Sequence, residues 1–539
     1  MAFPDFEATA PVFARTLAER FGARELIVTH DRRMTYAEAE TRSAHMARGL
    51  LAEGVGKGSR VALLMPNGPD WIVTWLAITR IGAIAVPLNT FFRFRELEWV
   101  LHHADVQHLL AVSGFLSHDY RERLEEAAPA LAHASAATPL RLPNLPCLRS
   151  IHLLGECDRP WAKPAEALQA STVDAALLAA VEASVTPADA MMILYSSGST
   201  ADPKGVVHTH GTILRHSHNL LAMRDIDEDD RVWSPMPFFW VGGLVYAFLG
   251  TMHSGACLLC EEVFDPESTL AFIEGERASV LLGWPHFGKA LAEHPSASER
   301  DLGCLRKGNM PDILPASLVP ADPELRPNAL GMTETCGPHT WCRDGALPEA
   351  LRGSFGSAVA GVEHKVVDPE SGERLPPGEL GEICVRGYSL MQGLYKVERE
   401  EVFDDEGFYH TGDGGYFDRG GVLYFKGRLG DMIKTAGANV TPSEIEQVVV
   451  AYPEVKAAYV VGVPDEERGQ SVAAAVVLEP GQITDPGALR ARLKREISAY
   501  KVPRHIFVQS EHELPFTDTG KIDKQRLTLL LSERIQGGE

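Results

Sequence analysis

The chain has 539 residues, of which 45% are hydrophobic and 23% charged, and its formal net charge at pH 7 is −22. This length predicts two to four domains with large buried cores. The acidic net charge argues against a general nucleic-acid binder. The amino-terminal residues carry no basic region, and no apolar run reaches the ~18 residues of a membrane helix. Neither a signal peptide nor a membrane protein is therefore expected.

Helical and strand patterns alternate in the first third of the chain. Residues 36–51 have apolar side chains at three- and four-residue steps, which predicts an amphipathic helix, and another helix pattern begins at Pro69. The apolar runs 61–65 and 83–87 predict buried strands. The glycine-rich segment 54–59 precedes a strand, so it is predicted to be a turn and not a phosphate loop. This alternation predicts an α/β fold with parallel sheets covered by helices.

A hydroxyl-rich loop follows the apolar run Met191–Leu194. From Tyr195 to Val207 the chain reads Tyr-Ser-Ser-Gly-Ser-Thr-Ala-Asp-Pro-Lys-Gly-Val-Val. Glycine lets backbone N–H groups approach phosphate oxygens, the hydroxyls donate hydrogen bonds, and Lys204 supplies a positive charge. The loop is therefore a candidate polyphosphate site, although not a Walker A loop, because no Gly-Lys-Ser/Thr follows at the right spacing. Taken alone, a polar surface turn explains it equally well.

Two groups of residues after this loop resemble metal sites in composition. Four histidines follow it: His208, His210, His216 and His218. Two are expected at a strand end and two in the next helix, and no Cys or Glu shares the spacing, which favours structural histidines. Cys257 and Cys260 lie in an apolar run, which favours a buried strand. The eight cysteines are scattered, a pattern typical of reduced thiols in a cytoplasmic protein.

The last third of the chain changes character. Short strand patterns with Gly-Glu and Asp-Arg-Gly-Gly turns predict a small β-rich subdomain over residues 366–426. From about residue 431 onward, mixed helix and strand patterns extend over roughly 110 residues, which is the size of a small separate domain. The glycine-rich, charged segment 426–431 between these regions is predicted to be a linker.

Five separated segments occur in the order and at the spacings of one enzyme family. They are the loop 195–207, Gly331–Thr335, Tyr409–Asp413, Gly427–Lys434 and Pro515–Lys521. On these segments the chain resembles the adenylate-forming superfamily, which includes acyl-CoA synthetases, luciferases and the adenylation domains of peptide synthetases. The resemblance runs from about Thr35 to about Arg526. It implies an N-terminal domain (residues 1–429) of two helix-covered sheets plus the β-rich subdomain, and a small mobile α+β C-terminal domain (residues 430–539).

The resemblance implies a two-step reaction. A carboxylate attacks the α-phosphate of ATP, giving an acyl adenylate and pyrophosphate, and a thiol, usually that of CoA, then displaces AMP. Both steps develop negative charge, so electrostatic positioning is expected to dominate catalysis. The leading hypothesis is an ATP-dependent acid–CoA ligase that uses Mg²⁺. Its partners would be a small-molecule acid, ATP and CoA, with no nucleic acid and no membrane. The oligomeric state stays open, a homodimer being one arrangement.

The resemblance also implies roles for individual residues. Thr333 would donate its hydroxyl to the α-phosphate and the substrate carboxylate, and Glu334 would hold Mg²⁺. Without the resemblance, a helix N-cap followed by a first-turn acid is the favoured interpretation of this pair. Lys521 would bridge the attacking carboxylate and the α-phosphate. The other ATP-binding positions implied are Ser196, Ser197, Gly198, Ser199, Thr200 and Lys204 over the phosphates, Leu330 and Gly331 near adenine, and Asp413 and Arg428 at the ribose.

In this family the C-terminal domain rotates between the two steps. Gly430 occupies the hinge position, where Asp or Lys is common, and glycine absorbs a backbone rotation easily. Leu330 stands where an aromatic residue often packs on adenine. The loop from Lys434 to Ala438 is expected to line the pantetheine tunnel. Its small residues, Ala436, Gly437 and Ala438, suit a backbone that lies close to a thin ligand arm.

The expected acyl pocket departs from the family pattern. Trp240 replaces a frequent histidine and offers a large apolar wall, behind which Gly242, Gly243 and Gly283 are expected to leave room. Together with Trp284, these residues predict an apolar and bulky carboxylic acid, although core packing is the alternative role for tryptophan and methionine. The pocket positions are Trp240, Val241, Gly242, Gly243, Gly283, Trp284, Gly308, Asn309 and Met310.

Three other functions compete with a CoA ligase. The acyl group could pass to an amine or to a carrier-protein thiol, although aromatic residues at 238–240 argue against an α-amino acid substrate. Ser196–Ser199 loosely resembles the serine loops of amidases, but a hydrolase leaves Asp413 and Lys521 unexplained and lacks an activating base. A nucleotide-binding protein without turnover is disfavoured by the intact Glu334 and Lys521.

Overall fold

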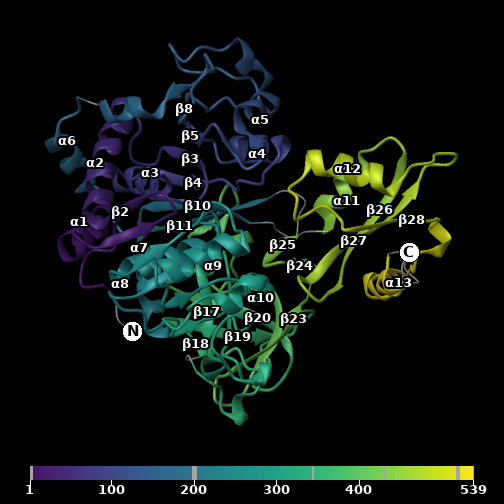
Figure 1. Cartoon of the computed structure of the whole chain (residues 1–539). Helices are drawn as coiled ribbons and strands as arrows, with labels where there is room; N and C mark the ends of the chain where they lie inside the picture. Colours follow the sequence, from purple (N-terminus) through teal and green to yellow (C-terminus); the bar gives the residue numbers. More distant parts are fainter. Residues whose placement is uncertain are drawn as a thin grey trace. The chain divides into compact units, whose positions relative to one another are not determined.

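The computed structural model describes residues 4–170, 172–196, 203–342, 345–429, 433–440, 442–516 and 522–537. The chain forms two compact units (Figure 1). The first comprises residues 1–90, 101–194 and 205–427, and the second comprises residues 91–100, 195–204 and 428–539. Among the described residues, no helix combines the length and the apolar character needed to cross a membrane.

An eight-stranded sheet forms one half of the α/β part of the first unit. Its strands lie in the order β21 (Gly393–Leu394), β11 (Lys204–Thr209), β10 (Ala190–Ser196), β4 (Ile84–Pro87), β3 (Arg60–Leu64), β5 (His108–Val112), β8 (Ser150–Leu154) and β9 (Lys163–Pro164). The pairs of β3 with β4 and with β5 are parallel, as are β4 with β10 and β5 with β8. The strands predicted at 61–65 and 83–87 are thus confirmed as β3 and β4.

A six-stranded sheet forms the other half. Its order is β15 (Lys307–Gly308), β14 (Val280–Leu281), β12 (Arg231–Trp233), β13 (Cys257–Leu259), β1 (Glu25–Val28) and β2 (Arg33–Thr35). All its pairs are parallel except β1 with β2. Cys257 lies in β13 and Cys260 directly after it, both buried, so the predicted buried strand is confirmed. A short hairpin, β6 (Gly114–Phe115) with β7 (His118–Asp119), lies outside both sheets.

The helices of this part begin at recognisable signals. The predicted helix 36–51 is confirmed as α2 (Tyr36–Ala52), whose first turn is closed by a capping box of Thr35 and Glu38. The helix predicted at Pro69 is confirmed as α3 (Pro69–Arg80). The others are α1 (Ala10–Phe21), α4 (Phe94–His103), α5 (Tyr120–Ala127), α6 (Ala175–Glu182), α7 (His210–Asn219), the π-helix η4 (Gly242–Leu249), α8 (Gly250–Ser254), α9 (Pro266–Gly275) and α10 (Pro285–Glu293).

Antiparallel strands complete the first unit. A three-stranded sheet contains β16 (Ala329–Met332), β17 (Gly337–Trp341) and β18 (Ser357–Ala358), and a four-stranded sheet contains β19 (Val362–Val367), β20 (Gly381–Gly387), β22 (Tyr409–Phe417) and β23 (Leu423–Arg428). The predicted β-rich subdomain is confirmed, and the antiparallel strands begin earlier than expected, at Ala329.

The second unit is built on a mixed sheet. Its main path runs β25 (Ala438–Val440), β24 (Ile433–Thr435), β27 (Gly469–Leu478), β26 (Val455–Asp465), and β28 (His505–Val508) pairs with β27 in parallel. The helices are α11 (Pro442–Val450), α12 (Pro486–Glu496) and α13 (Lys524–Gln536). Apolar side chains such as Ile445, Val460 and Leu493 form its core. The fold is therefore α/β with a separate α+β C-terminal domain, as expected.

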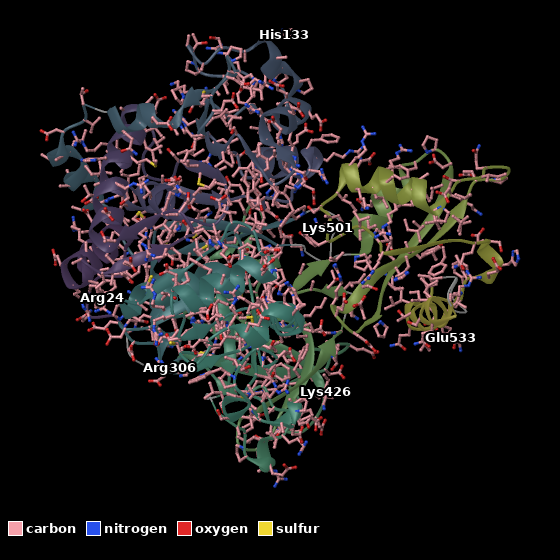
Figure 2. The ribbon with its side chains drawn as sticks, viewed as in Figure 1. Arg24, His133, Arg306, Lys426, Lys501 and Glu533 are labelled. Atoms are coloured by element: carbon pink, nitrogen blue, oxygen red, sulfur yellow. The ribbon has the colours of Figure 1, made fainter. Side chains whose placement is uncertain are left out.

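A buried lysine holds part of the second unit together. Lys501, labelled in Figure 2, places its Nζ 2.8 Å from Oε1 of Glu96 and 2.6 Å from Oε1 of Glu444, and its side chain is 1% exposed. Ser498 donates its hydroxyl to the same Glu96 carboxylate at 2.8 Å. Burial alone would lower the pKa of the Lys501 ammonium, but the two carboxylates outweigh it and raise that pKa.

Replacing Lys501 by methionine should destabilise the second unit by about 3–5 kcal/mol, because two carboxylates are left buried without their shared cation. Hydrogen exchange of the β26 and β27 amides in increasing urea would measure this loss. Lys494→Met, at an exposed position of α12, is the matched control and should have little effect. Equal stability of the two variants would contradict the role given to Lys501.

Candidate active site

A tight β-hairpin carries Thr333 and Glu334. They lie in the turn between β16 and β17, so the N-cap interpretation of this pair is wrong: no helix begins here. The buried hydroxyl of Thr335 accepts the Met332 N–H at 3.1 Å and donates to the Gly337 carbonyl at 2.7 Å. The Thr335 side chain therefore satisfies the backbone groups of the turn. Thr333 and Glu334 remain half-buried and accessible to a ligand.

The glycine that precedes this turn is required by packing. A Cβ on Gly331 would lie 2.4 Å from the carbonyl oxygen of Gly337 on the opposite strand. On the other side of the hairpin, a Cβ on Gly337 would lie 3.5 Å from Cγ1 of Val241, at the start of η4. The structure thus brings the Thr333–Glu334 turn and the expected acyl-pocket segment together within the first unit.

Gly331→Ala should lower ATP-dependent pyrophosphate release at least about 10-fold, because β16 and β17 must separate to admit the methyl group and the turn then loses its position. Gly275→Ala, at the end of α9 where a Cβ meets no atom within 4 Å, is the control and should retain activity. Rates of pyrophosphate release for both variants would test this. Full activity of Gly331→Ala would contradict a positioning role for the hairpin.

The Glu334 carboxylate has a partner that the sequence analysis did not single out. The hydroxyl of Tyr409, the first residue of β22, lies 3.5 Å from Oε1 of Glu334, and the Glu334 carbonyl accepts the Met391 N–H at 2.8 Å. A half-buried carboxylate with oxygen neighbours has the donor chemistry that Mg²⁺ prefers. Glu334 therefore fits the expected metal role.

A buried histidine joins the hairpin to the strand that follows the phosphate loop. His208 lies on β11, and its Nε2 is 2.7 Å from the carbonyl oxygen of Thr333. Burial lowers the pKa of His208 to about 4, so the ring is neutral at pH 7 and Nε2–H donates this hydrogen bond. Because β11 begins at Lys204, one strand carries both the expected phosphate lysine and the support of Thr333.

The other histidines after the loop are also structural. His210 accepts the Ala10 N–H at 3.1 Å, and His216 lies 3.0 Å from the Pro338 carbonyl. Neither of these two histidines belongs to a group of potential metal ligands within the described residues. One placement was wrong: His210 is the first residue of α7, so only His208 lies on the strand.

Asp413 is held inside a strand and not in a turn, which corrects the interpretation of Gly412–Gly414 taken alone. It lies in β22 and is 1% exposed. Its N–H donates to Oγ1 of Thr411 at 3.0 Å, and the preceding Gly412, at φ +70°, donates its N–H to Oε1 of Glu382 at 2.9 Å. Thr411 and Glu382 therefore fix the backbone around Asp413, and sequence reasoning missed both.

Several expected ATP-binding residues lie at strand ends or outside the described residues. Ser196 ends β10, Lys204 begins β11, Arg428 ends β23 and Leu330 is buried in β16. The expected positions that lie outside the described residues are Ser197, Gly198, Ser199, Thr200, Gly430 and Lys521.

The expected pantetheine segment is a two-residue hairpin between β24 and β25. Thr435 pairs with Ala438, and the turn residues Ala436 and Gly437 both have positive φ, +48° and +80°. Such turns match the twist of the flanking strands, and glycine suits them. Lys434 lies in β24 and donates its N–H to Oε1 of Gln470 at 2.8 Å. The small residues of this segment thus meet a backbone requirement of the turn.

The expected room behind Trp240 does not exist at two of its three glycines. A Cβ on Gly243 would lie 2.0 Å from the Pro237 carbonyl oxygen, and one on Gly283 would lie 2.8 Å from Sδ of Met310. At Gly242 the nearest atom is 3.6 Å away. These glycines let backbone and Met310 pack closely, so the prediction of empty volume is corrected to one of close packing.

Two tryptophans form the aromatic face of this region. The rings of Trp240 and Trp284 lie 5.6 Å apart at 65°, an edge-to-face contact. Asn309, after β15, accepts the Gly283 N–H at 2.8 Å through Oδ1 and so fixes the chain just before Trp284. Gly308 itself is packed against the carbonyl of Leu281.

Asn67 anchors the segment that carries Trp240. Its amide donates to the Met236 carbonyl at 2.9 Å, and its Oδ1 accepts the Phe238 N–H at 2.8 Å. Phe238 stacks on Phe248 of η4 with ring centroids 5.1 Å apart. A π-helix is rare and frequently marks a functional site, and η4 begins at Gly242, one of the residues of the expected acyl pocket.

The AMP-binding enzyme family matches residues 14–395, and the AMP-binding enzyme C-terminal domain matches residues 444–521. The chain belongs to this family. The resemblance to the adenylate-forming superfamily is therefore confirmed, and this AMP-binding enzyme is an AMP-forming ligase of the acyl-CoA synthetase type that uses ATP and CoA.

Relatives of this AMP-binding enzyme match nearly end to end. A feruloyl-CoA synthase of Amycolatopsis sp is 33% identical over 505 residues, covering 91% of this chain and 92% of the relative. A 3-[(3aS,4S,7aS)-7a-methyl-1,5-dioxo-octahydro-1H-inden-4-yl]propanoyl:CoA ligase of Mycobacterium tuberculosis is 32% identical over 530 residues, covering 96% and 98%.

Solved structures show the same fold. The amide bond synthetase McbA of Marinactinospora thermotolerans is 26% identical with a TM-score of 0.79, covering 96% of this chain and 99% of its own. ATP-bound MatB of Rhodopseudomonas palustris is 26% identical with a TM-score of 0.62, covering 97% and 99%.

Proposed function

We propose that this AMP-forming acid–CoA ligase activates an apolar, bulky carboxylic acid. The observation that carries the proposal is the edge-to-face pair of Trp240, which follows the segment anchored by Asn67, and Trp284, which follows the Gly283 held by Asn309. Flat aromatic walls favour ring-bearing or branched apolar acids over short polar ones. The relatives named for feruloyl and for methyl-dioxo-octahydroindenyl propanoyl groups, both ring-bearing, support this substrate class.

For the adenylation step, we propose which reacting group each polar or charged residue contacts. The acid attacks the α-phosphate and pyrophosphate leaves, so Lys204 and the loop hydroxyls would stabilise the departing β- and γ-phosphates. Thr333 would hold the α-phosphate and the attacking carboxylate in line, and Asp413 would accept hydrogen bonds from the ribose hydroxyls. Glu334 would hold Mg²⁺, which neutralises phosphate charge. Positioning and electrostatic stabilisation would then supply most of the rate enhancement.

The thioester step would use the C-terminal domain differently. We propose that residues 430–539 rotate about Gly430, bringing Lys521 to the site for adenylation and the turn of Ala436 and Gly437 to it afterwards. Once the acyl adenylate has formed, the CoA thiol attacks its carbonyl carbon and AMP leaves. Neither turn residue carries a side chain longer than a methyl group, which supports close approach of a narrow pantetheine arm.

A second candidate is transfer of the acyl group to an amine. It is favoured by the similarity to the amide bond synthetase, whose structure this chain matches with a TM-score of 0.79. Both candidates share the adenylation step and differ only in the acceptor.

Pyrophosphate release with a panel of aliphatic, aromatic and polycyclic acids, each with and without CoA, tests the proposal. We expect release with apolar ring-bearing acids and thioester only when CoA is present. Amide formed on addition of amines, with CoA left unconsumed, would establish the second candidate. Activity confined to short polar acids would refute the substrate class.

We also propose a cytoplasmic location, with reduced thiols. All eight cysteines are free, including the five buried ones at 257, 260, 336, 342 and 384. Free buried thiols persist in a reducing compartment. Cell fractionation with a compartment marker would test this.

A further inference from the structure

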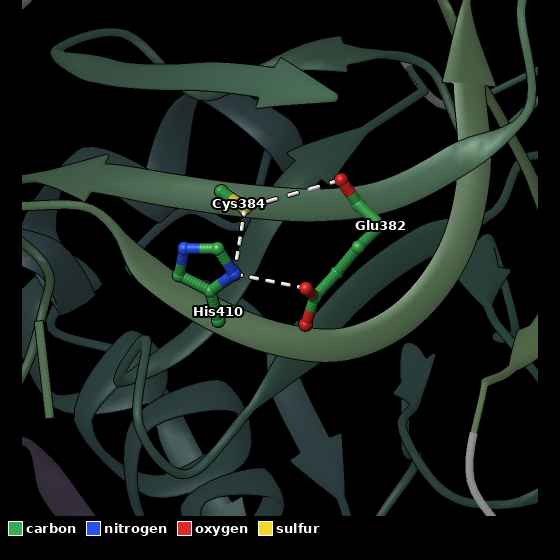
Figure 3. A group of neighbouring side chains, drawn as sticks. All are labelled: Glu382, Cys384 and His410. Atoms are coloured by element: carbon green, nitrogen blue, oxygen red, sulfur yellow. Dashed lines mark hydrogen bonds and ion pairs between the residues drawn. The ribbon is translucent and has the colours of Figure 1, made fainter. Parts of the chain in front are cut away.

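Three side chains with metal-binding chemistry converge between β20 and β22 (Figure 3). Cys384 of β20 and His410 of β22 are direct cross-strand partners, and Glu382 lies two residues before Cys384. Residues two apart in a strand project from the same face, so Glu382 and Cys384 share a face of β20. The register shifts between them, Glu382 pairing with Gly414, and the Glu382 side chain reaches back along the strand to His410. Their potential ligand atoms all lie within 4.8 Å of one another, and no other group of three or more His, Cys, Asp or Glu side chains among the described residues does so.

The distances fit a shared ion. Nδ1 of His410 lies 2.8 Å from Oε2 of Glu382 and 3.5 Å from Sγ of Cys384. Donor atoms bonded to one tetrahedral Zn²⁺ at about 2.0–2.3 Å lie about 3.3–3.5 Å apart, so the His410–Cys384 separation fits as it stands and the His410–Glu382 hydrogen bond would open by about 0.5 Å. The His410 side chain is 41% exposed, which provides a path from solvent to the buried sulfur.

Asp404 lies on the far side of the imidazole. Its Oδ2 is 3.6 Å from Nε2 of His410. A histidine ligand commonly directs its other N–H to a carboxylate, which fixes the tautomer and leaves the first nitrogen free to bind. In the metal-free protein Nδ1–H donates to Glu382 at 2.8 Å, and an ion bound at Nδ1 would move this proton to Nε2, on the side of Asp404. The neighbouring Lys365 is paired with Asp404 at 2.7 Å and with Glu406 at 2.8 Å, so its charge is compensated.

We propose that Glu382, Cys384 and His410 form a Zn²⁺ site, separate from the Mg²⁺ position proposed at Glu334. A thiolate, an imidazole and a carboxylate together select Zn²⁺ over Mg²⁺, which prefers oxygen ligands alone. Three protein ligands leave the fourth tetrahedral position to water. On binding, the Cys384 thiol loses its proton to solvent and the sulfur bonds the ion, with no change of oxidation state.

The position of the site has a structural consequence. Oε1 of Glu382 accepts the Gly412 N–H, next to Asp413, while Oε2 faces the site. An ion bound through Oε2 would join β20 to β22 beside this turn. We therefore expect Zn²⁺ to raise the melting temperature of the enzyme.

Cobalt(II) titration of the metal-free full-length enzyme, with Mg²⁺ in excess, tests the site. We expect one equivalent bound with the ultraviolet charge-transfer absorption of a cobalt–thiolate bond, displaced by one equivalent of Zn²⁺. Cys384→Ser should abolish the absorption, and His410→Gln should weaken Co²⁺ binding at least about 10-fold. Cys260→Ser, which removes a buried thiol in the other part of the first unit, is the matched control and should keep the full signal.

Two results would overturn the proposal. One is Co²⁺ bound without thiolate absorption by the unaltered enzyme. The other is absorption that persists in Cys384→Ser and disappears in Cys260→Ser. If Cys384→Ser folds poorly, His410→Gln provides a second test, because the His410 side chain is half-exposed and its replacement should not impair folding. Unchanged Co²⁺ affinity in His410→Gln would refute the site.

Discussion

Replacement of Lys521 by alanine is expected to lower acid-dependent pyrophosphate release at least about 100-fold, the effect of removing one pre-positioned charge from the reacting atoms. Thioester formation from supplied acyl adenylate and CoA should stay within about 2-fold of normal, because the proposed role of this ammonium ends when the adenylate has formed. Rapid-quench assays of the two half-reactions measure both effects on one preparation.

Lys524→Ala is the matched control for this prediction. Lys524 begins α13, three residues further along, and lies 3.8 Å from Glu446 in a peripheral ion pair. It should retain both half-reactions. Equal loss of both half-reactions in Lys521→Ala would remove the assignment of this residue to adenylation.

Acid is expected to unfold the first unit well before its carboxylates titrate. The unit buries a set of histidines: His108, His152, His208, His210, His216, His253 and His339. Burial lowers the pKa of each, to about 4 for His108, His152 and His208 and to about 3 for His210 and His216. It holds the pKa of His253 and His339 well below the ordinary value.

The direction in which the free energy of unfolding changes with pH follows from proton uptake. Between pH 6.5 and about 4 the unfolded chain binds protons on these rings and the folded chain does not, so the free energy of unfolding falls as pH falls. Each histidine contributes a slope of about 1.4 kcal/mol per pH unit in that window, and none above it. Urea unfolding at pH 7, 6 and 5, followed by the fluorescence of the unit's buried tryptophans, should show midpoints that drop steeply below pH 6.5.

His152→Leu provides a direct check on the cause. Neither ring nitrogen of His152 makes a hydrogen bond to a described residue. The leucine variant should therefore be as stable as the unaltered enzyme, or more stable, at pH 7. Below pH 6.5, the number of protons taken up on unfolding should fall by up to one. An unchanged dependence in this variant, or urea midpoints that stay constant from pH 7 to 5 in the unaltered enzyme, would contradict the histidine account.

The sequence patterns predicted the parts of the fold that depend on periodicity. The strands β3 and β4 and the helices α2 and α3 were predicted because apolar spacing and capping signals are local, and the buried strand at Cys257 followed from the same reasoning. The turn of Thr333 and Glu334 was misread without the family resemblance, because the hydroxyl–acid pair that caps helices also occurs in hairpins.

The supports of the site could not be predicted from local patterns. Asn67 and Phe238 are 171 positions apart in the sequence, and His208 and Thr333 are 125 apart, so neither contact leaves a short-range signal. The pocket glycines were misjudged for a related reason. A glycine has the same letter whether it borders empty space or, as at Gly243, a carbonyl oxygen that no side chain could displace.

The π-helix η4 gives this pocket an unusual route to change. Such segments hold one residue more than a regular helix over the same length. Loss of a single residue from Gly242–Leu249 would restore regular winding and change the direction of side chains within this segment, while the following helix α8 keeps its own. The aromatic ring of Tyr246 would then face a different neighbour, while Trp240, anchored upstream by Asn67, stayed in place. Acid preference in this lineage could thus shift through a change in chain length, which a comparison of substitutions at aligned positions would overlook.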